Sequence, residues 1–235
     1  MWLINSSIGR KLIMSISGVF LILFLTFHLA MNVAAVFSES AYNMICAFLG
    51  ANWYAVAGTL VLAAGFLVHI VYSVMLTLQN RKARGNNRYA VNNRPAEVEW
   101  ASQNMFVLGL IVAGFLLLHF SQFWYKMMFA ELMGQHGVAL GDTMVSPQNG
   151  VAFIRYYFSN VVIVALYLLW YAALWFHLTH GFWSALQTIG WNNSVWFNRW
   201  KVASDVFATL ICLGFAFVTL FFYVKSLLCE GVCWV

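Results

Sequence analysis

The chain has very little charge and almost no proline. Only 8% of its 235 residues are charged and two are proline, whereas 63% are hydrophobic. Soluble globular domains carry about 25% charged residues, so this composition excludes an ordinary water-soluble fold. It is the composition of an integral membrane protein.

The chain also lacks the motifs of enzymes that act on water-soluble substrates. The polar segments 80–99 and 127–150 contain no glycine-rich phosphate loop, no Ser/His/Asp arrangement and no carboxylate cluster. The four cysteines show no metal-binding spacing. Two of them, Cys229 and Cys233, are interpreted as free thiols, with a disulfide between them as the alternative. Catalysis on a soluble substrate is therefore not expected, and no catalytic residue is assigned.

Long apolar runs are what the chain does have. A helix needs about 20 apolar residues to cross a bilayer, and five runs reach that length. We predict an all-α fold, an integral membrane bundle of five transmembrane helices in one domain, residues 1–235. The expected helices span approximately 12–37, 53–80, 103–128, 153–186 and 202–226.

Basic residues flank these runs and predict their orientation. Arg10 and Lys11 precede the first run, five basic residues lie between 81 and 94, and Arg199 and Lys201 precede the fifth. Because successive crossings alternate in direction, these three places share one side. The positive-inside rule then predicts a cytoplasmic N-terminus and an outer C-terminus. Basic residues placed this way are topology signals, and no nucleic-acid partner is expected.

Each of the first four runs contains one deeply placed histidine: His28, His69, His119 and His177. An ionisable side chain within lipid is costly and needs a partner or a task. A single membrane histidine is more often a hydrogen-bonded packing residue. Four of them favour metal ligation, and haem in particular, because haem iron accepts axial imidazole nitrogens.

The depths of two of these histidines place them in the outer half of the membrane. Along a helix, each residue adds about 1.5 Å of height. His28 lies 17 residues after Lys11, and His119 lies 19 residues after Trp100, both on helices that run outward. These two imidazoles are therefore predicted to form an outer haem site.

The other two histidines lie nearer the cytoplasm. His69 lies 12 residues before Arg81, and His177 lies 14 residues before Trp191, both on helices that run inward. They are predicted to form an inner haem site. His180 lies three residues after His177 on the same helix face, so height alone leaves it open as an alternative ligand or as a hydrogen-bond donor to a haem propionate or a quinone.

Two segments carry a family resemblance: SSIGRKLIMSISGVFLILFLTFHLAMN at 6–32 and FHLTHGFWSALQTIGW at 176–191. They closely resemble the two-haem cytochrome b anchor subunit of succinate:quinone oxidoreductases, in its single-chain, five-helix form. The resemblance extends over essentially the whole chain, including one histidine in each of the first four helices. The family's fourth-helix pattern, a histidine four residues before a glycine, matches His177 and Gly181 and favours His177 over His180.

The resemblance implies two b-type haems and a quinone, commonly menaquinone. It also implies an iron-sulfur subunit and a flavoprotein subunit on the cytoplasmic face, and a multi-pass location in a bacterial cytoplasmic membrane, with lipid around the helices. Chemistry on succinate or fumarate would belong to the partner subunits, with the quinone site contributed by this chain. Some members carry a carboxylate near the fourth-helix ligand for proton transfer, whereas this chain has Trp175 and Phe176 there.

Further residues are candidates for holding the quinone and the haem propionates. Glu39 and Tyr42 are the quinone-site candidates, although Glu39 also fits a solvated loop. Propionates need cationic or hydroxyl partners, for which the candidates are Arg10, Lys11, Ser15, Ser17 and Arg155. Anchoring at the membrane edge explains the basic ones equally well.

Two alternative functions remain open from the residues. One is the cytochrome b subunit of a hydrogenase or a formate dehydrogenase, whose partner would sit outside the membrane. The other is a transporter that uses its histidines as a proton relay. A transporter would be expected to have buried carboxylates or broken helices, and the sequence offers neither clearly.

Overall fold

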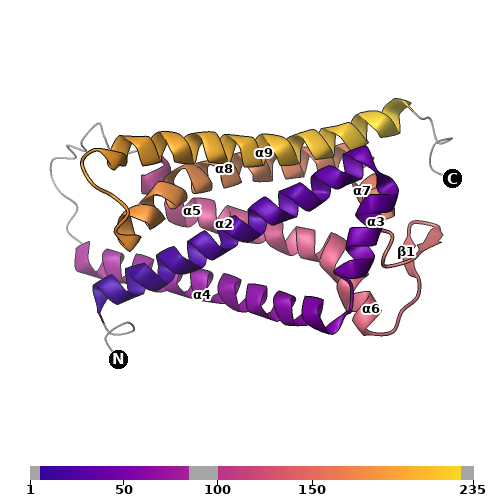
Figure 1. Cartoon of the computed structure of the whole chain (residues 1–235), viewed down its shortest axis with the longest axis horizontal. Helices are drawn as coiled ribbons and strands as arrows, with labels where there is room; N and C mark the ends of the chain where they lie inside the picture. The colour runs from indigo at the N-terminus through magenta and orange to yellow at the C-terminus, as the bar shows by residue number, and fades with distance from the viewer. Residues whose placement is uncertain (1–5, 85–99, 229–235) are drawn as a thin grey trace. The chain divides into compact units, whose positions relative to one another are not determined.

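The structure, a computed structural model, describes residues 6–84 and 100–228 (Figure 1). Five of its helices are long and apolar enough to cross a membrane: Ser7–Phe37, Trp53–Ala83, Trp100–Leu132, Val161–Ile189 and Trp196–Leu228. The predicted all-α bundle is therefore confirmed. Most of the basic loop after the second span, and the pair Cys229 and Cys233, lie outside the described residues. The orientation of the termini stays a prediction.

The five spans are built from seven described elements. The first, second, fourth and fifth are α2 (Ser7–Phe37), α4 (Trp53–Arg84), α8 (Val161–Ile189) and α9 (Trp196–Leu228). The third begins as α5 (Trp100–His119), continues as the π-helix η1 (Phe120–Phe129) and ends in α6 (Ala130–Leu132). A π-helix is rare and frequently marks a functional site. Here it begins directly after His119.

The expected helix 153–186 is two helices. It consists of α7 (Gly150–Phe158) and α8, separated by Ser159 and Asn160. The Asn160 side-chain oxygen accepts hydrogen bonds from the backbone amides of Val162, at 2.9 Å, and Ile163, at 3.3 Å. Such an N-cap begins a new helix. Hydropathy did not reveal the break because the residues on both sides are apolar.

Shorter elements occupy segments that were expected to be loops. Helix α3 (Glu39–Phe48) follows α2 directly, and the Ser38 hydroxyl caps it by accepting from the Ala41 amide at 3.2 Å. Strands β1 (Val138–Leu140) and β2 (Thr143–Val145) form an antiparallel hairpin in the segment before α7. These elements give the segments between the long helices a defined structure.

The described residues fall into two compact units, and each long helix contributes to both. The first unit comprises those of Met1–Phe24, Val61–Leu110 and Leu174–Thr209, and the second comprises those of Leu25–Leu60, Ile111–Ala173 and Leu210–Val235. His69 and His177 belong to the first unit, whereas His28 and His119 belong to the second.

The two units are packed differently. The largest fully buried hydrophobic side chains, those of Phe153, Phe222, Ile154 and Val151, all belong to the second unit. In the first unit the most buried side chains are the small ones of Ser204 and Ala208.

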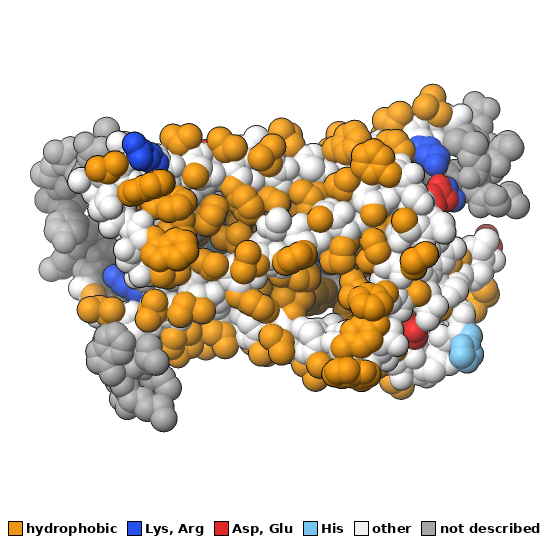
Figure 2. Space-filling model, viewed as in Figure 1, with side chains coloured by type: hydrophobic (Ala, Val, Ile, Leu, Met, Phe, Trp, Pro, Cys, Tyr) orange, Lys and Arg blue, Asp and Glu red, His pale blue; other side chains and the backbone are white. Residues whose placement is uncertain are grey.

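The long helices expose apolar side chains along their sides. On the face drawn in Figure 2, hydrophobic side chains cover these helices, and charged side chains lie toward the helix ends. Residues such as Leu60, Leu117 and Leu213 are more than half exposed. A surface of this kind suits contact with lipid chains.

Candidate functional site

In the second unit, the rings of His28 and His119 lie close together, edge to face. His28 comes from α2 and His119 is the last residue of α5. Their ring centroids are 5.8 Å apart and the ring planes are inclined by 87°. Both side chains are half-buried.

In the first unit, His69 of α4 and His177 of α8 form a second pair. Their ring centroids are 6.3 Å apart, at an interplanar angle of 71°. The two pairs are the ones that helix depth predicted. Their role as haem ligands stays a prediction.

Both separations fit two imidazoles on opposite sides of one metal ion. A bond between a metal and an imidazole nitrogen is about 2 Å long, and the nitrogen lies about 1 Å from the ring centroid, so two axial rings have centroids about 6 Å apart. The observed distances of 5.8 Å and 6.3 Å match this arrangement. The donor set therefore suits a bis-histidine haem at each pair, with the porphyrin supplying the remaining ligands.

Glycines face the His69–His177 pair. A Cβ atom on Gly18 would lie 3.3 Å from the Cε1 atom of His69, and one on Gly109 would lie 3.5 Å from the Cε1 atom of His177. A side chain larger than methyl at either position would press on the imidazole. Gly18 and Gly109 thus give the two rings room to take up a defined position.

Gly65, which precedes His69 by about one turn, has a different role. A Cβ atom there would lie 2.6 Å from the ring of Phe20. Gly65 therefore allows α4 to approach α2 closely.

The Nδ1 atoms of two histidines lie close to hydroxyl groups. In the first unit the Ser17 hydroxyl lies 3.2 Å from Nδ1 of His69. In the second unit the Tyr167 hydroxyl lies 3.3 Å from Nδ1 of His119. Such hydrogen bonds orient a metal-binding histidine and leave its Nε2 atom for the metal. Ser17, expected as a propionate partner, contacts His69, and its role at a propionate stays a prediction.

Aromatic rings surround the His28–His119 pair. Phe123 and Trp170 lie 5.1 Å and 5.7 Å from the His119 ring, and Phe215 lies 5.8 Å from the His28 ring, all measured between centroids. Sequence reasoning did not single out Phe123, Phe215 or Tyr167 as site residues. Their only signal was their type, since aromatic residues are common throughout the chain.

Two buried nitrogens in these surroundings make no hydrogen bond within the described residues: Nδ1 of His177 and Nε1 of Trp170. Buried polar atoms nearly always have a partner, so each exception needs a reason. Trp170 packs against His119, and His177 is a member of the other pair. Both exceptions therefore lie beside the histidine pairs.

His180 lies in a different environment from His177. Its ring packs edge-on against that of Trp183, with centroids 5.0 Å apart. The ring of His69 instead faces His177. The geometry favours His177 as the member of the pair, in agreement with the expected fourth-helix pattern.

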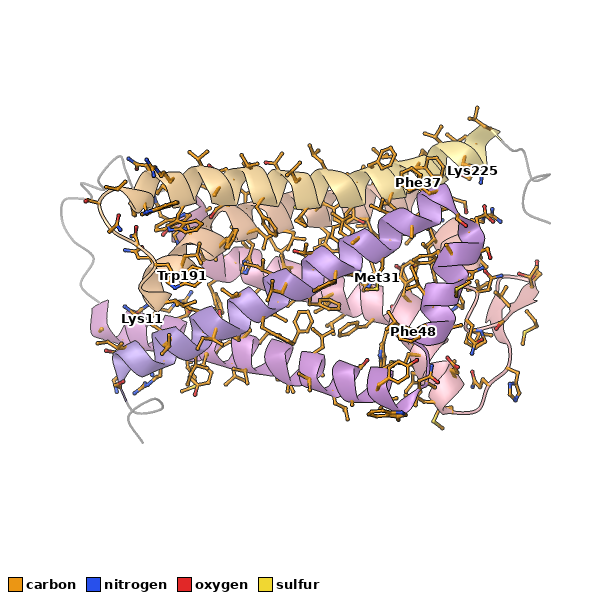
Figure 3. All side chains as sticks on the ribbon, in the orientation of Figure 1. Lys11, Met31, Phe37, Phe48, Trp191 and Lys225 are labelled. Carbon is orange, nitrogen blue, oxygen red and sulfur yellow. The ribbon has the colours of Figure 1, made fainter. Side chains whose placement is uncertain are left out.

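Glu39 and Arg155 lie in an ion-pair cluster at one end of the second unit. The Arg155 guanidinium donates to the Glu39 carboxylate, and Lys225 donates to the same oxygen at 3.2 Å. Figure 3 labels Lys225 near the end of α9, close to Phe37 at the end of α2. The cluster joins α3, α7 and α9. Glu39, the quinone-site candidate, and Arg155, the propionate candidate, therefore bind each other.

Tyr42 is buried next to this cluster on the same helix. Its hydroxyl donates to the Asn32 side-chain oxygen at 3.3 Å. Burial raises the pKa of Tyr42 well above its ordinary value and raises the pKa of Cys46 to about 11. Both groups therefore stay protonated at neutral pH.

The remaining propionate candidates lie along the first half of α2. Ser15 is buried, Arg10 is half-buried and Lys11 is exposed. Figure 3 labels Lys11 in the first turns of this helix. An exposed lysine at a helix end fits a role at the membrane interface.

Comparison with models of protein families, with curated proteins and with solved structures gives no match. Among residues 6–84 and 100–228, no group of three or more His, Cys, Asp or Glu side chains is arranged to hold a metal ion. A bis-histidine haem takes only two ligands from the protein. The two histidine pairs and the sequence resemblance are therefore the features that bear on function.

Proposed function

We propose that this chain is the membrane-anchor and electron-transfer subunit of a succinate dehydrogenase or fumarate reductase. It binds two b-type haems, one at His28 and His119 and one at His69 and His177. The observation that carries the proposal is the presence of two histidine pairs, each with rings about 6 Å apart, the separation that two axial ligands of one metal require. The resemblance of 6–32 and 176–191 to the cytochrome b anchors supplies the identity of the complex.

Bound haem supplies a one-electron carrier whose potential depends on its axial ligands, their hydrogen bonds and the local polarity. The chain's own residues set these properties. The four imidazoles provide the axial nitrogens, and the Ser17 and Tyr167 hydroxyls orient two of them. The apolar helices keep water and charge away from the carriers.

The partners in this proposal are an iron-sulfur subunit and a flavoprotein subunit on the cytoplasmic face of a bacterial inner membrane. Arg10, Lys11, Arg199 and Lys201 belong to the basic side of the chain. They would lie against that face under the positive-inside rule. Electrons would pass between the partner and membrane quinone, with menaquinone as the expected species.

Helix α3 is the proposed quinone-binding element. Tyr42 and Glu39 are three residues apart on it and so share a face. Tyr42 is a protonated hydroxyl at neutral pH, and a quinone carbonyl would replace the Asn32 side-chain oxygen as the acceptor of its one hydrogen. The Arg155 and Lys225 side chains hold the Glu39 carboxylate at the end of the helix bundle's second unit.

Haem counting tests the proposal directly. Purified wild-type protein should contain two haems per chain, with a reduced-minus-oxidised spectrum typical of bis-histidine cytochrome b. His69→Ala should retain one haem, because only one pair has lost a ligand. His136→Ala is the control, since His136 is exposed and belongs to neither pair. A wild-type protein without haem would refute the proposal.

A further inference from the structure

The hydroxyl group of Tyr167 has only one hydrogen, and the surroundings of the ring indicate where it points. Tyr167 donates to the side-chain oxygen of Gln122 at 2.7 Å. An amide oxygen accepts and cannot donate. The Tyr167 oxygen therefore points a lone pair, and no hydrogen, toward Nδ1 of His119, which lies 3.3 Å away. The oxygen can only accept a hydrogen bond from this nitrogen. Only a protonated Nδ1 atom can complete that hydrogen bond.

Ser17 repeats this arrangement in the first unit. Its hydroxyl donates to the backbone carbonyl of Met14 at 2.9 Å, and a carbonyl also only accepts. The Ser17 oxygen then faces Nδ1 of His69, 3.2 Å away, as an acceptor. Two unrelated side chains on different helices thus impose the same protonation pattern on one histidine of each pair.

Burial makes this assignment specific. Tyr167 is 2% exposed, Gln122 6% and Ser17 7%, so water is not available to replace these partners. A buried polar group without a hydrogen bond is strongly disfavoured. With the opposite orientation, the Tyr167 hydroxyl would leave the Gln122 oxygen without this donor. The orientation described keeps that buried pair and the bond from Ser17 to the Met14 carbonyl.

A neutral imidazole that carries its hydrogen on Nδ1 has its lone pair on Nε2. We infer that Tyr167, held by Gln122, and Ser17, held by the Met14 carbonyl, are positioning residues that fix the tautomer and ring rotation of His119 and His69, so that each presents Nε2 to iron. The identity of the metal rests on the proposed function. The hydrogen-bond directions rest on the geometry of these side chains alone.

Substitution of the hydroxyl groups tests the inference through the haem potentials. A hydrogen bond from Nδ1 makes the imidazole a more basic ligand, which favours oxidised iron. Tyr167→Phe should therefore shift the midpoint potential of one haem to a more positive value and weaken retention of that haem about 10-fold. Ser17→Ala should do the same to the other haem. Gln122→Leu should move the same potential as Tyr167→Phe, by a smaller amount.

Matched controls separate positioning from general damage. Tyr171 lies one turn after Tyr167 and its hydroxyl bonds to Thr219 at 2.9 Å, so Tyr171→Phe removes another buried hydroxyl without touching a histidine hydrogen bond. Ser226 donates to the Tyr223 carbonyl at 2.6 Å, as Ser17 does to Met14, and Ser226→Ala removes that bond alone. Neither control should move a haem potential.

The outcomes distinguish this inference from the proposed function. Suppose that the wild type contains two haems. The inference alone would then be overturned if the haem potentials do not change in Tyr167→Phe and Ser17→Ala, or if they change equally in the control variants. A wild type without haem would overturn the proposed function. In that case the nitrogen NMR spectrum of the histidine side chains decides the inference, since hydrogen on Nε2 of His119 and His69 would contradict it.

Discussion

The two units surround their histidine pairs in different ways. In the first unit, Gly18 and Gly109 face the His69 and His177 rings. In the second unit, aromatic side chains such as Phe123 and Trp170 pack around His119. The ring separation is therefore about 6 Å in both units, although glycines line the pair in the first unit and large aromatic side chains line the pair in the second. The first unit should therefore be sensitive to substitutions that enlarge a side chain, and the second unit to substitutions that shorten one.

Enlarging Gly18 should give the largest effect. Gly18→Leu places a branched side chain where a single Cβ atom already approaches His69 to 3.3 Å. We expect loss of the haem at His69 and His177 with retention of the other haem, measured as one haem per chain. Gly58→Leu is the control, because no heavy atom lies within 4 Å of its added Cβ. Equal haem loss in both variants would break the contrast between the units.

Truncating a core side chain of the second unit should lower stability. Phe153 is 0% exposed, and a Phe→Ala substitution in a packed core costs about 3–5 kcal/mol. Phe153→Ala should therefore lower the thermal unfolding midpoint in detergent. Phe217→Ala removes the same atoms from a side chain that is 55% exposed and should have a much smaller effect. Similar midpoints for the two variants would show that the second unit is not tightly packed.

The Cys46 thiol offers a pH-dependent comparison. Burial raises its pKa from 9.0 to about 11, so the folded chain keeps this proton between pH 9 and 11 while the unfolded chain releases it. The free energy of unfolding should therefore fall as pH rises through this range. Cys46→Ser should flatten that decrease. Alkylation of Cys46, followed by mass spectrometry, should likewise remain slow until pH approaches 11.

Neutralising Glu39 should give the smallest effect. Its carboxylate is 41% exposed and accepts from Arg155 and Lys225, and pairs of this kind contribute about 1 kcal/mol or less. Glu39→Gln should lower the thermal midpoint slightly, and added salt should reduce the difference. Glu131→Gln, in the same unit, removes a carboxylate that accepts from Gln148 instead of a cation, and it should show no salt dependence.

Sequence reasoning predicted the long helices and the histidine pairing because both depend on local properties. Apolar length identifies a membrane span, and a fixed rise per residue converts position into depth. The break at Asn160, the π-helix after His119 and helix α3 were not predicted. They depend on side-chain caps and on hydrogen-bond register, to which average hydropathy is insensitive.

The amino-acid sequence by itself determined that this chain has five helices long and apolar enough to cross a membrane, and which histidines share a level, because hydrophobicity and helical rise are properties of a single segment. Only the tertiary structure decided what faces each ring: Gly18 against His69, and Tyr167 with Gln122 beside His119. These contacts join residues about 50 positions apart in the chain. They follow from how neighbouring helices are rotated and packed against one another, which no one segment specifies.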